Sequence, residues 1–285
     1  MPKKVIITCA LTGVLAKKEQ CPAIPYSPVE IAEEALRAYN AGATMVHIHA
    51  RTPDGGPSWE SSVFGDIKKE IVKRCPVIIN FSSGGIGLPI SERTRHIVDH
   101  KPHVAALNMG SMNYAIYSSK RKMFYHDYVF TNPFGDIQYC LEQITLAGAK
   151  PELECFDVGH INNALPFIDM GILKTPAHFS LILGVLGGIS SRPGNLTCMA
   201  ANLPAGSHWE VIGIGREQWK LIREALEIDG DIRVGLEDNF YLPDGTMAKS
   251  NADLVSMGVK MVQEMGKEVA SLEEAKKLLG FSIQL

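Results

Sequence analysis

The feature that most constrains this chain is a regular alternation of two kinds of segment. Apolar runs of strand length are followed by amphipathic stretches of helix length, and this pair recurs about eight times along the sequence. The expected strands are residues 4–9, 44–50, 77–81, 104–108, 152–156, 180–185, 208–212 and 231–236. The expected helices are residues 28–40, 64–74, 91–99, 136–146, 162–170, 195–201, 216–228 and 252–265. This order predicts a parallel sheet covered by helices.

Two α/β architectures satisfy strict alternation: an open doubly wound sheet and a closed (β/α)8 TIM barrel. A length of 285 residues with about eight units favours the barrel. The glycine fingerprint of a dinucleotide-binding Rossmann fold does not follow the first strand. Because no shift of composition indicates a linker, we expect one catalytic domain over residues 1–285.

Composition narrows the possible partners. The formal net charge is −3 and no basic cluster stands out, which argues against binding to nucleic acid or to an anionic membrane surface. The six cysteines lack CxxC spacing, which is typical of a reduced, cytoplasmic protein. The apolar N-terminal segment lacks a signal-peptide cleavage site, and no run reaches the ~20 apolar residues of a membrane span. We expect small-molecule partners and a homo-oligomer.

Polar motifs gather where the expected strands end, which is where TIM barrels carry their chemistry. His47 and His49 share one face of the second strand, because strand side chains alternate. Glu237 is expected on the face of the eighth strand that carries Arg233, in the matching layer of side chains. Two imidazoles and one carboxylate predict a metal site suited to Zn²⁺, and Fe²⁺, Co²⁺ or Mn²⁺ accept the same ligands. The alternative is a pair of structural histidines.

Three further charged residues lie at these strand ends. Arg233 and Glu154 fall within barrel strands, where a buried charge needs a partner, so we interpret both as functional. Asp238 is expected on the face opposite Glu237, where it is either catalytic or a helix cap. Arg51 is expected to anchor the "TPDGG" loop.

Two glycine-rich segments, "SSGG" at 82–85 and "GGISSRPGN" at 187–195, are candidate anion sites. Arg192 in the second offers a bidentate partner for a phosphate. Ordinary glycine-rich loops are the alternative for both segments.

Taken together, the motifs resemble those of the β-keto acid cleavage enzymes, whose best-known activity is 3-keto-5-aminohexanoate cleavage. The resemblance covers essentially the whole chain and rests on the motifs "ITCALTG", "AGATMVHIHAR", "NFSSGG", "LNMGSMN", "PELECFD", "LGVLGGISSRPGNL", "GIGR" and "RVGLEDN". It implies a zinc-dependent (β/α)8 barrel that forms a homotetramer. The implied reaction takes a β-keto acid and acetyl-CoA and returns acetoacetate and a new acyl-CoA.

The resemblance also implies roles for individual residues. The implied metal ligands are His47, His49 and Glu237, and the implied catalytic residues are Arg233, Asp238 and Glu154. The residues assigned to the substrate are Ser82, Gly85 and Asn108, and Arg192 is assigned to the acetyl-CoA cofactor.

Two positions depart from the amino-acid-cleaving family member. Its acidic residue that holds the substrate ammonium is matched, one place further along, by Leu15, and a threonine before "LN" is matched by Ala106. An ammonium group would meet an apolar side chain without a counter-charge. We therefore expect a substrate other than the 5-amino acid, with a neutral tail.

Two other functions remain open. An amidohydrolase-like metal hydrolase also uses an HxH pair in a barrel, but on the first strand and with further ligands on the fifth and sixth; here His178 lies at the wrong strand end. A non-catalytic barrel that binds a metal or a ligand would have little use for Arg233, Glu154 and Asp238.

Overall fold

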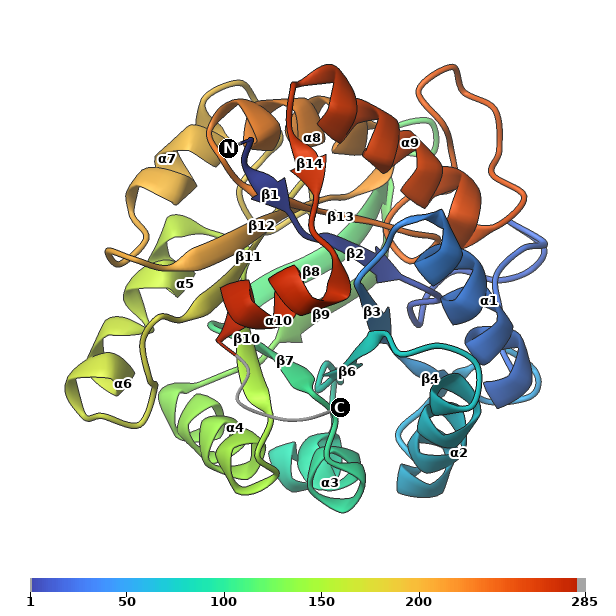
Figure 1. Ribbon diagram of the computed structural model, residues 1–285. Helices are drawn as coiled ribbons and strands as arrows, with labels where there is room; N and C mark the ends of the chain where they lie inside the picture. The colour runs from blue at the N-terminus through green and yellow to red at the C-terminus, as the bar shows by residue number, and fades with distance from the viewer. Residues whose placement is uncertain (1, 281–285) are drawn as a thin grey trace.

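The structure is a computed structural model and describes residues 2–280. Its centre is a closed barrel of eight parallel strands (Figure 1). These strands are β2 (Ile7–Ala10), β3 (Met45–Ile48), β6 (Ile78–Ser82), β7 (Val104–Asn108), β10 (Lys150–Cys155), β11 (His178–Leu183), β12 (His208–Gly213) and β13 (Asp231–Val234). The ring closes because the last of these, β13, pairs with the first, β2. The predicted (β/α)8 barrel is confirmed.

Helices surround the barrel. They are α1 (Pro28–Ala41), α2 (Ser61–Val72), α3 (Ile90–His100), α4 (Phe134–Leu146), α5 (Val158–Asn162), α6 (Leu165–Asp169), α7 (Asn195–Ala201), the 3₁₀ helix η1 (Gly215–Glu217), α8 (Gln218–Glu227) and α9 (Asn251–Glu264). In α1, Ser27 caps the first turn and forms a capping box with Glu30. Ile31, Ala35 and Ala38 then form the buried stripe that packs on the barrel.

The expected helix over residues 162–170 is wrong, because this region holds the two short helices α5 and α6. Asp157 caps α5. Pro166 stands in the first turn of α6, where its ring is compatible with a new helix but not with the interior of a continuous one. The fold therefore restarts the helix at Leu165.

The amino end of the barrel is closed by a helix and a strand that the sequence did not predict, and by the first part of the expected strand 4–9. Helix α10 (Leu272–Leu279) packs on Ile6, Met45 and Ile78. The strands β1 (Lys4–Val5) and β14 (Glu268–Val269) pair beside it. The expected first strand is split at Ile6, whose N–H donates to the side-chain carboxylate of Asp231 rather than to a backbone carbonyl of a neighbouring strand. This end is therefore an apolar plug.

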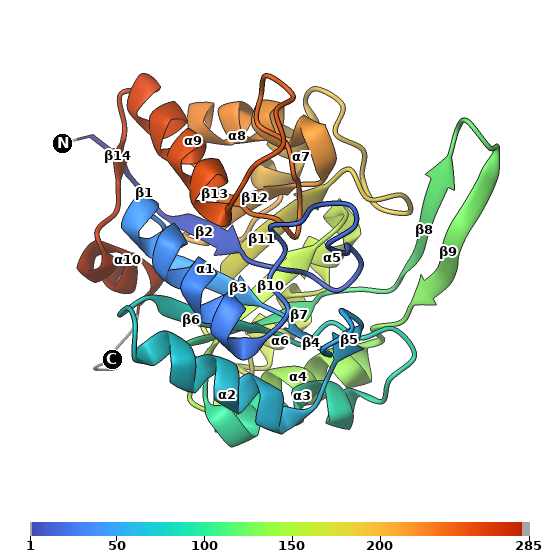
Figure 2. The same cartoon turned by 90° about the vertical axis from the view of Figure 1, so that its right-hand side faces the viewer.

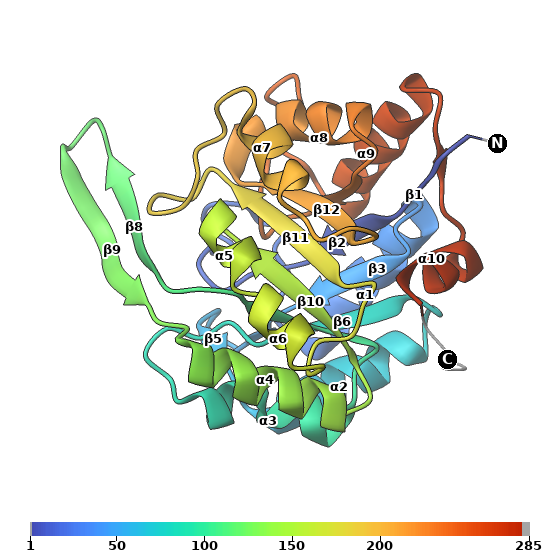
Figure 3. The same ribbon diagram turned by 90° about the vertical axis from the view of Figure 1, so that its left-hand side faces the viewer.

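The opposite end carries a long hairpin that was not predicted either. Strands β8 (Met112–Ser118) and β9 (Met123–Phe130) extend from β7 and stand beside the carboxyl end of the barrel, away from α10 (Figures 2 and 3). The loop after β11 reaches the hairpin, because Leu186 bridges to Ala115. A smaller hairpin, β4 (Ala50–Arg51) with β5 (Pro57–Ser58), follows β3. Both hairpins belong to the mouth.

Within residues 2–280, the structure contains no helix whose length and apolar character would let it cross a lipid bilayer.

Candidate active site

Three side chains with metal-binding atoms meet at the carboxyl end of the barrel. His47 is on β3, His49 follows that strand, and Glu237 lies in the turn after β13. Glu237 Oε1 is 3.8 Å from His47 Nε2 and 3.4 Å from His49 Nε2. One ligand atom of each residue lies within 4.8 Å of the other two. The structure thus brings together the three residues that the sequence singled out as metal ligands.

The chemical state of these groups fits a divalent cation. His47 is fully buried, and neither of its ring nitrogens has a hydrogen-bond partner within residues 2–280. Burial and the nearby Arg233 lower the pKa of His47 well below its usual value, which keeps the imidazole neutral as a ligand must be. Burial opposes ionisation of Glu237, but the guanidinium of Arg233 holds its pKa well below the usual range. Neutral imidazoles and a carboxylate are the donors that Zn²⁺ accepts.

A turn at Gly235 orients the acidic residues of this site. Gly235 has a φ of 139°, and a methyl group there would lie 2.1 Å from the carbonyl oxygen of Ala10. Only glycine permits this close approach. The strand therefore ends at Val234 rather than at residue 236, and the side-chain alternation expected beyond it is lost.

The expectation that Asp238 faces away from Glu237 is accordingly wrong. Both carboxylates contact Arg233: its Nη2 is 3.0 Å from Glu237 Oε1, and its Nε donates to Asp238 Oδ2 over 2.9 Å. A second bond joins Arg233 Nη2 to Asp238 Oδ1 over 3.0 Å. The pair is bidentate, so Asp238 is fixed by the guanidinium rather than by a helix terminus.

Glu154 completes this cluster from β10. Its Oε1 lies 3.7 Å from Arg233 Nη1, which has no hydrogen-bond partner within the described residues. Burial, reinforced by Glu152, raises the pKa of Glu154 to about 8. Burial raises the pKa of Asp238 to about 6, with Arg233 opposing that shift. At neutral pH the site therefore offers a neutral carboxylic acid beside a carboxylate, which suits proton transfer.

The "SSGG" loop runs beside the metal ligands. Gly84 N–H donates to Ser82 Oγ over 3.1 Å. A methyl group on Gly84 would lie 3.8 Å from His49 Cε1 and 4.0 Å from Asn108 Nδ2. Asn108 Oδ1 is buried and has no partner within residues 2–280. Ser82 and Asn108 therefore line the mouth, whereas a methyl group on Gly85 would point toward Trp59 and Arg93.

Two arginines named from the sequence lie elsewhere. Arg192 is exposed in the loop after β11, and its guanidinium makes no hydrogen bond or ion pair within residues 2–280. Arg51 is buried and donates to the carbonyl oxygen of Gly55, which agrees with the loop-anchoring role expected for it. It also donates to Gly13 O over 2.7 Å, so it joins two loops of the mouth.

The comparison of the whole chain with known proteins gives this site its context. Residues 4–281 match the family described as "beta-keto acid cleavage enzyme". The chain belongs to this family. It is 38% identical over 281 residues to a 3-keto-5-aminohexanoate cleavage enzyme of Fusobacterium nucleatum, and the match covers 98% of each chain. It is also 34% identical over 296 residues to a 3,5-dioxohexanoate:acetyl-CoA acetone transferase of Paraburkholderia graminis, covering 97% and 96% of the two chains.

Solved structures give the same fold. The apo structure of ObcA superposes with a TM-score of 0.78 at 21% identity, over 92% of this chain and 66% of that one. A ternary complex of ObcA with a C4-CoA adduct and oxalate gives a TM-score of 0.75 at 20% identity, over 91% and 68%. At this identity the likeness establishes the barrel alone.

A second polar layer beneath the site was missed by the sequence reasoning. Glu152 and Glu210 are fully buried inside the barrel of this family member. Ser180 Oγ lies 2.5 Å from Glu152 Oε1 and 3.2 Å from Glu210 Oε1, and Thr8 Oγ1 donates to Glu210 Oε2 over 2.5 Å. Burial raises the pKa of both carboxyl groups. The "PELE" motif held a usable signal, because Glu152 has the same strand phase as Glu154.

Proposed function

We propose that this chain is a metal-dependent enzyme that condenses a β-keto acid with acetyl-CoA and releases acetoacetate and a new acyl-CoA. The observation that carries the proposal is the meeting of His47, His49 and Glu237 with the Arg233–Asp238 pair in one buried mouth. Support also comes from relatives whose names describe acetyl-CoA chemistry. Among them is a 3-oxoadipate:acetyl-CoA acetyltransferase of Cupriavidus necator, 32% identical over 286 residues.

The ion we propose is zinc, because the donor set is two imidazoles and one carboxylate. When bound, such an ion supplies Lewis-acid polarisation of the substrate oxygens and so acidifies the carbon between ketone and carboxylate. His47 Nε2 and Glu237 Oε2 are buried without a hydrogen-bond partner within the described residues, and a bound ion would supply the partner that each of them lacks.

Asp238 is the group we assign to proton transfer. Held by two hydrogen bonds from Arg233, it takes a proton from the carbon between the ketone and the carboxylate of the substrate. The resulting carbanion attacks the thioester carbonyl of acetyl-CoA and expels the CoA thiolate. The thiolate adds to the original ketone, and the bond between that carbon and the carbanion carbon breaks. This gives the new acyl-CoA, and Asp238 returns its proton to acetoacetate.

Glu154 is the second proton-active group. Its raised pKa, about 8, leaves it protonated at neutral pH, so it donates a hydrogen bond toward oxygens that gain negative charge. Arg233 orients this side chain, because its Nη1 lies 3.7 Å from Glu154 Oε1. We propose that Glu154 positions Asp238 and shares the proton work.

The two ends of the substrate have different surroundings. Its carboxylate is assigned to Ser82, Gly85 and Asn108, and the CoA phosphates to the exposed Arg192. The tail is assigned to the loop after β2, where Leu15 is 45% exposed. An apolar side chain offers an ammonium group no counter-charge, so we propose a β-keto acid with a neutral tail.

The decisive experiment gives the zinc-loaded enzyme acetyl-CoA and a panel of β-keto acids that differ only in the terminal group. Mass spectrometry then identifies each acyl-CoA. We expect an acyl-CoA from neutral-tailed acids and less from the 5-amino acid. Ammonia or a carboxylate released from an amide without CoA would favour the amidohydrolase-like alternative. Stoichiometric zinc without any acyl-CoA would favour a non-catalytic barrel.

We also propose that residues 1–285 form one catalytic domain, that the domain assembles as a homotetramer, and that it works in the cytoplasm. The family match over residues 4–281 supports the single domain. Light scattering on the purified protein measures the assembly, and a monomer would contradict it.

A further inference from the structure

Arg93 on α3 is a buried cation that the proposed mechanism leaves unused. It is 2% exposed. Its Nε donates to the carbonyl oxygen of Ser83 over 2.8 Å and its Nη2 to Asn132 Oδ1 over 2.8 Å. A longer contact of 3.5 Å joins Nη1 to the carbonyl oxygen of Thr131. All these acceptors are neutral.

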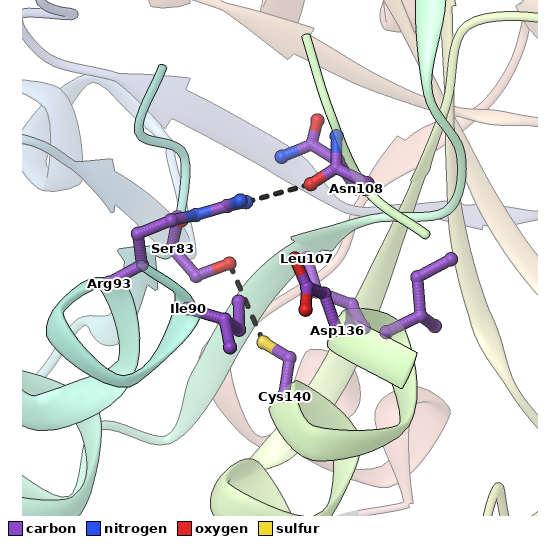
Figure 4. Close-up of a pocket in the computed structure, with 9 residues that line it drawn as sticks. Ser83, Ile90, Arg93, Leu107, Asn108, Asp136 and Cys140 are labelled. Atoms are coloured by element: carbon purple, nitrogen blue, oxygen red, sulfur yellow. Dashed lines mark hydrogen bonds between the residues drawn. The ribbon is translucent and has the colours of Figure 1, made fainter. Parts of the chain in front are cut away.

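The surroundings of Arg93 do not neutralise it. Asp136 lines the same small space but makes no hydrogen bond or ion pair with the guanidinium (Figure 4). Cys140, which also faces this space, donates to Ser83 Oγ and stays a neutral thiol because burial raises its pKa to about 11. An arginine buried without a carboxylate in contact is unfavourable, since its charge has lost water and gained only neutral hydrogen-bond acceptors, the Phe130 ring at 5.8 Å and the longer-range attraction of Asp136 and Glu154. Such a charge is relieved when an anion binds nearby.

The "SSGG" loop connects this charge to the site. A methyl group on Gly85 would lie 3.1 Å from Arg93 Cγ, whereas one on Gly84 would lie 3.8 Å from Cε1 of His49. Consecutive residues therefore face the arginine on one side and the metal ligand on the other. Trp59 Nε1 donates to the carbonyl oxygen of Gly84 over 3.0 Å and fixes the loop in this orientation.

One peptide unit transmits the effect. Arg93 donates to the carbonyl of Ser83, and the N–H of the same peptide, on Gly84, donates to Ser82 Oγ. Hydrogen bonds in a chain polarise one another, most strongly when the first donor is charged. Because Ser82 Oγ already accepts this bond, its own hydrogen is free to donate to an acceptor in the mouth.

We propose that Arg93 is a positioning residue. Its unpaired charge polarises the Ser83–Gly84 peptide and so strengthens the hydrogen bond that the Ser82 hydroxyl donates to the carboxylate of the β-keto acid. This inference rests on the proposed function, because it assumes that a β-keto carboxylate binds beside His49. It assigns carboxylate recognition to a side chain that does not itself touch the substrate.

The sharpest test gives Arg93 a permanent partner. Asn132→Asp sets a carboxylate against Nη2, and Asn132→Ala is the matched control, since both variants lose the bond from Asn132 Nδ2 to Gly110 O. Calorimetry on the zinc-loaded protein measures the binding of acetoacetate and of its uncharged methyl ester. We expect Asn132→Asp to weaken acetoacetate binding about tenfold, or about 1.4 kcal/mol, while ester binding stays unchanged. Asn132→Ala, which removes the acceptor of Arg93 Nη2 without adding a charge, does not weaken acetoacetate binding.

Kinetics separates this role from a structural one. In Asn132→Asp, we expect KM for the β-keto acid to rise about tenfold while KM for acetyl-CoA and the thermal midpoint keep their wild-type values. Equal weakening of acid and ester, or wild-type affinity for acetoacetate, would overturn the proposal. If Asn132→Asp does not fold, Arg93→Gln must weaken acetoacetate binding more than Arg93→Lys does, and equal affinities would overturn it.

The outcomes for the two proposals are distinguishable. A wild-type protein that binds acetoacetate but forms no acyl-CoA overturns the proposed function and leaves Arg93 open to the same calorimetric comparison. A zinc-loaded wild-type protein that binds no acetoacetate overturns both.

Discussion

Two buried arginines at the same end of the barrel have opposite surroundings. Arg233 is surrounded by the carboxyl groups of Asp238, Glu237 and Glu154. Arg93 bonds only to neutral oxygens. The first arginine is held by its partners and in turn fixes the acids that move protons. The second leaves its charge uncompensated, and that charge is available to an anionic ligand.

The difference teaches that burial alone does not define the role of a charged residue. A buried ion pair is neutralised inside the fold, so its removal disrupts the partners that remain. An unpaired buried charge, such as that of Arg93, instead attracts an anionic ligand on the other side of the "SSGG" loop. Substitutions in and around the two arginines should separate these two cases, and the largest effect is expected at the metal ligands.

The first prediction concerns the metal ligand nearest Glu237. His49→Ala removes one of three ligands, so we expect bound zinc and turnover to be abolished together. Elemental analysis of the purified variant and acyl-CoA formation measure both. The acidic residues around Arg233 remain, so we expect the fold to be retained. Circular dichroism measures this. If the variant kept stoichiometric zinc and full activity, His47, His49 and Glu237 would not be the metal site.

The second prediction breaks the neutralised arginine. Arg233→Met leaves the carboxylates of Glu237 and Asp238 without their cation, so we expect a loss of about 3–5 kcal/mol in the free energy of unfolding. Turnover should fall at least about a thousandfold, because Asp238 loses both hydrogen bonds that orient it. Denaturant titration and steady-state kinetics measure these effects. Arg233→Lys is the control, and a stability loss as small in Met as in Lys contradicts the ion-pair role.

The third prediction concerns the acids beneath Arg233. Burial and Glu152 raise the pKa of Glu210 well above its usual value. A carboxyl group whose folded-state pKa is raised stabilises the fold below its unfolded pKa, and this contribution is lost as pH rises toward the folded value. Glutamine at 210 keeps both hydrogen-bonding directions without that titration.

We therefore expect Glu210→Gln to match the wild type near pH 5 and to exceed it by about 1–3 kcal/mol at pH 8. Urea unfolding between pH 5 and pH 9 measures the difference. Thr8→Val, which removes the bond to Glu210, is the contrasting variant and should lose stability across the range. Parallel pH curves for wild type and Glu210→Gln would show that Glu210 does not titrate with folding.

The smallest expected effect lies at the far end of the substrate from Arg93. Leu15→Glu introduces a negative charge beside the tail, so we expect the preference for a 5-amino over a neutral-tailed β-keto acid to shift by about tenfold. Competition between the two acids, read from the acyl-CoA masses, measures it. Leu15→Gln separates charge from size. An unchanged ratio in both variants would put the tail elsewhere.

The site was predictable as far as local pattern reaches. The His-x-His spacing at 47 and 49 and the "GLED" segment carry their chemistry in sequence, and the barrel rule states where strand ends meet. Asp238 was assigned to the wrong face, because the alternation of a strand was extended past Gly235. That turn depends on contact with Ala10, which lies more than two hundred residues away along the chain.

The sequence by itself determined the alternation of strands and helices, because hydrophobic period and helix caps are local properties. It also determined which polar residue types reach the mouth. Only the tertiary structure decided which charges are paired: Arg233 acquires three carboxyl neighbours from two different strand ends, and Arg93 has none in contact. Pairing depends on distances between segments remote in sequence, and no local pattern encodes those distances.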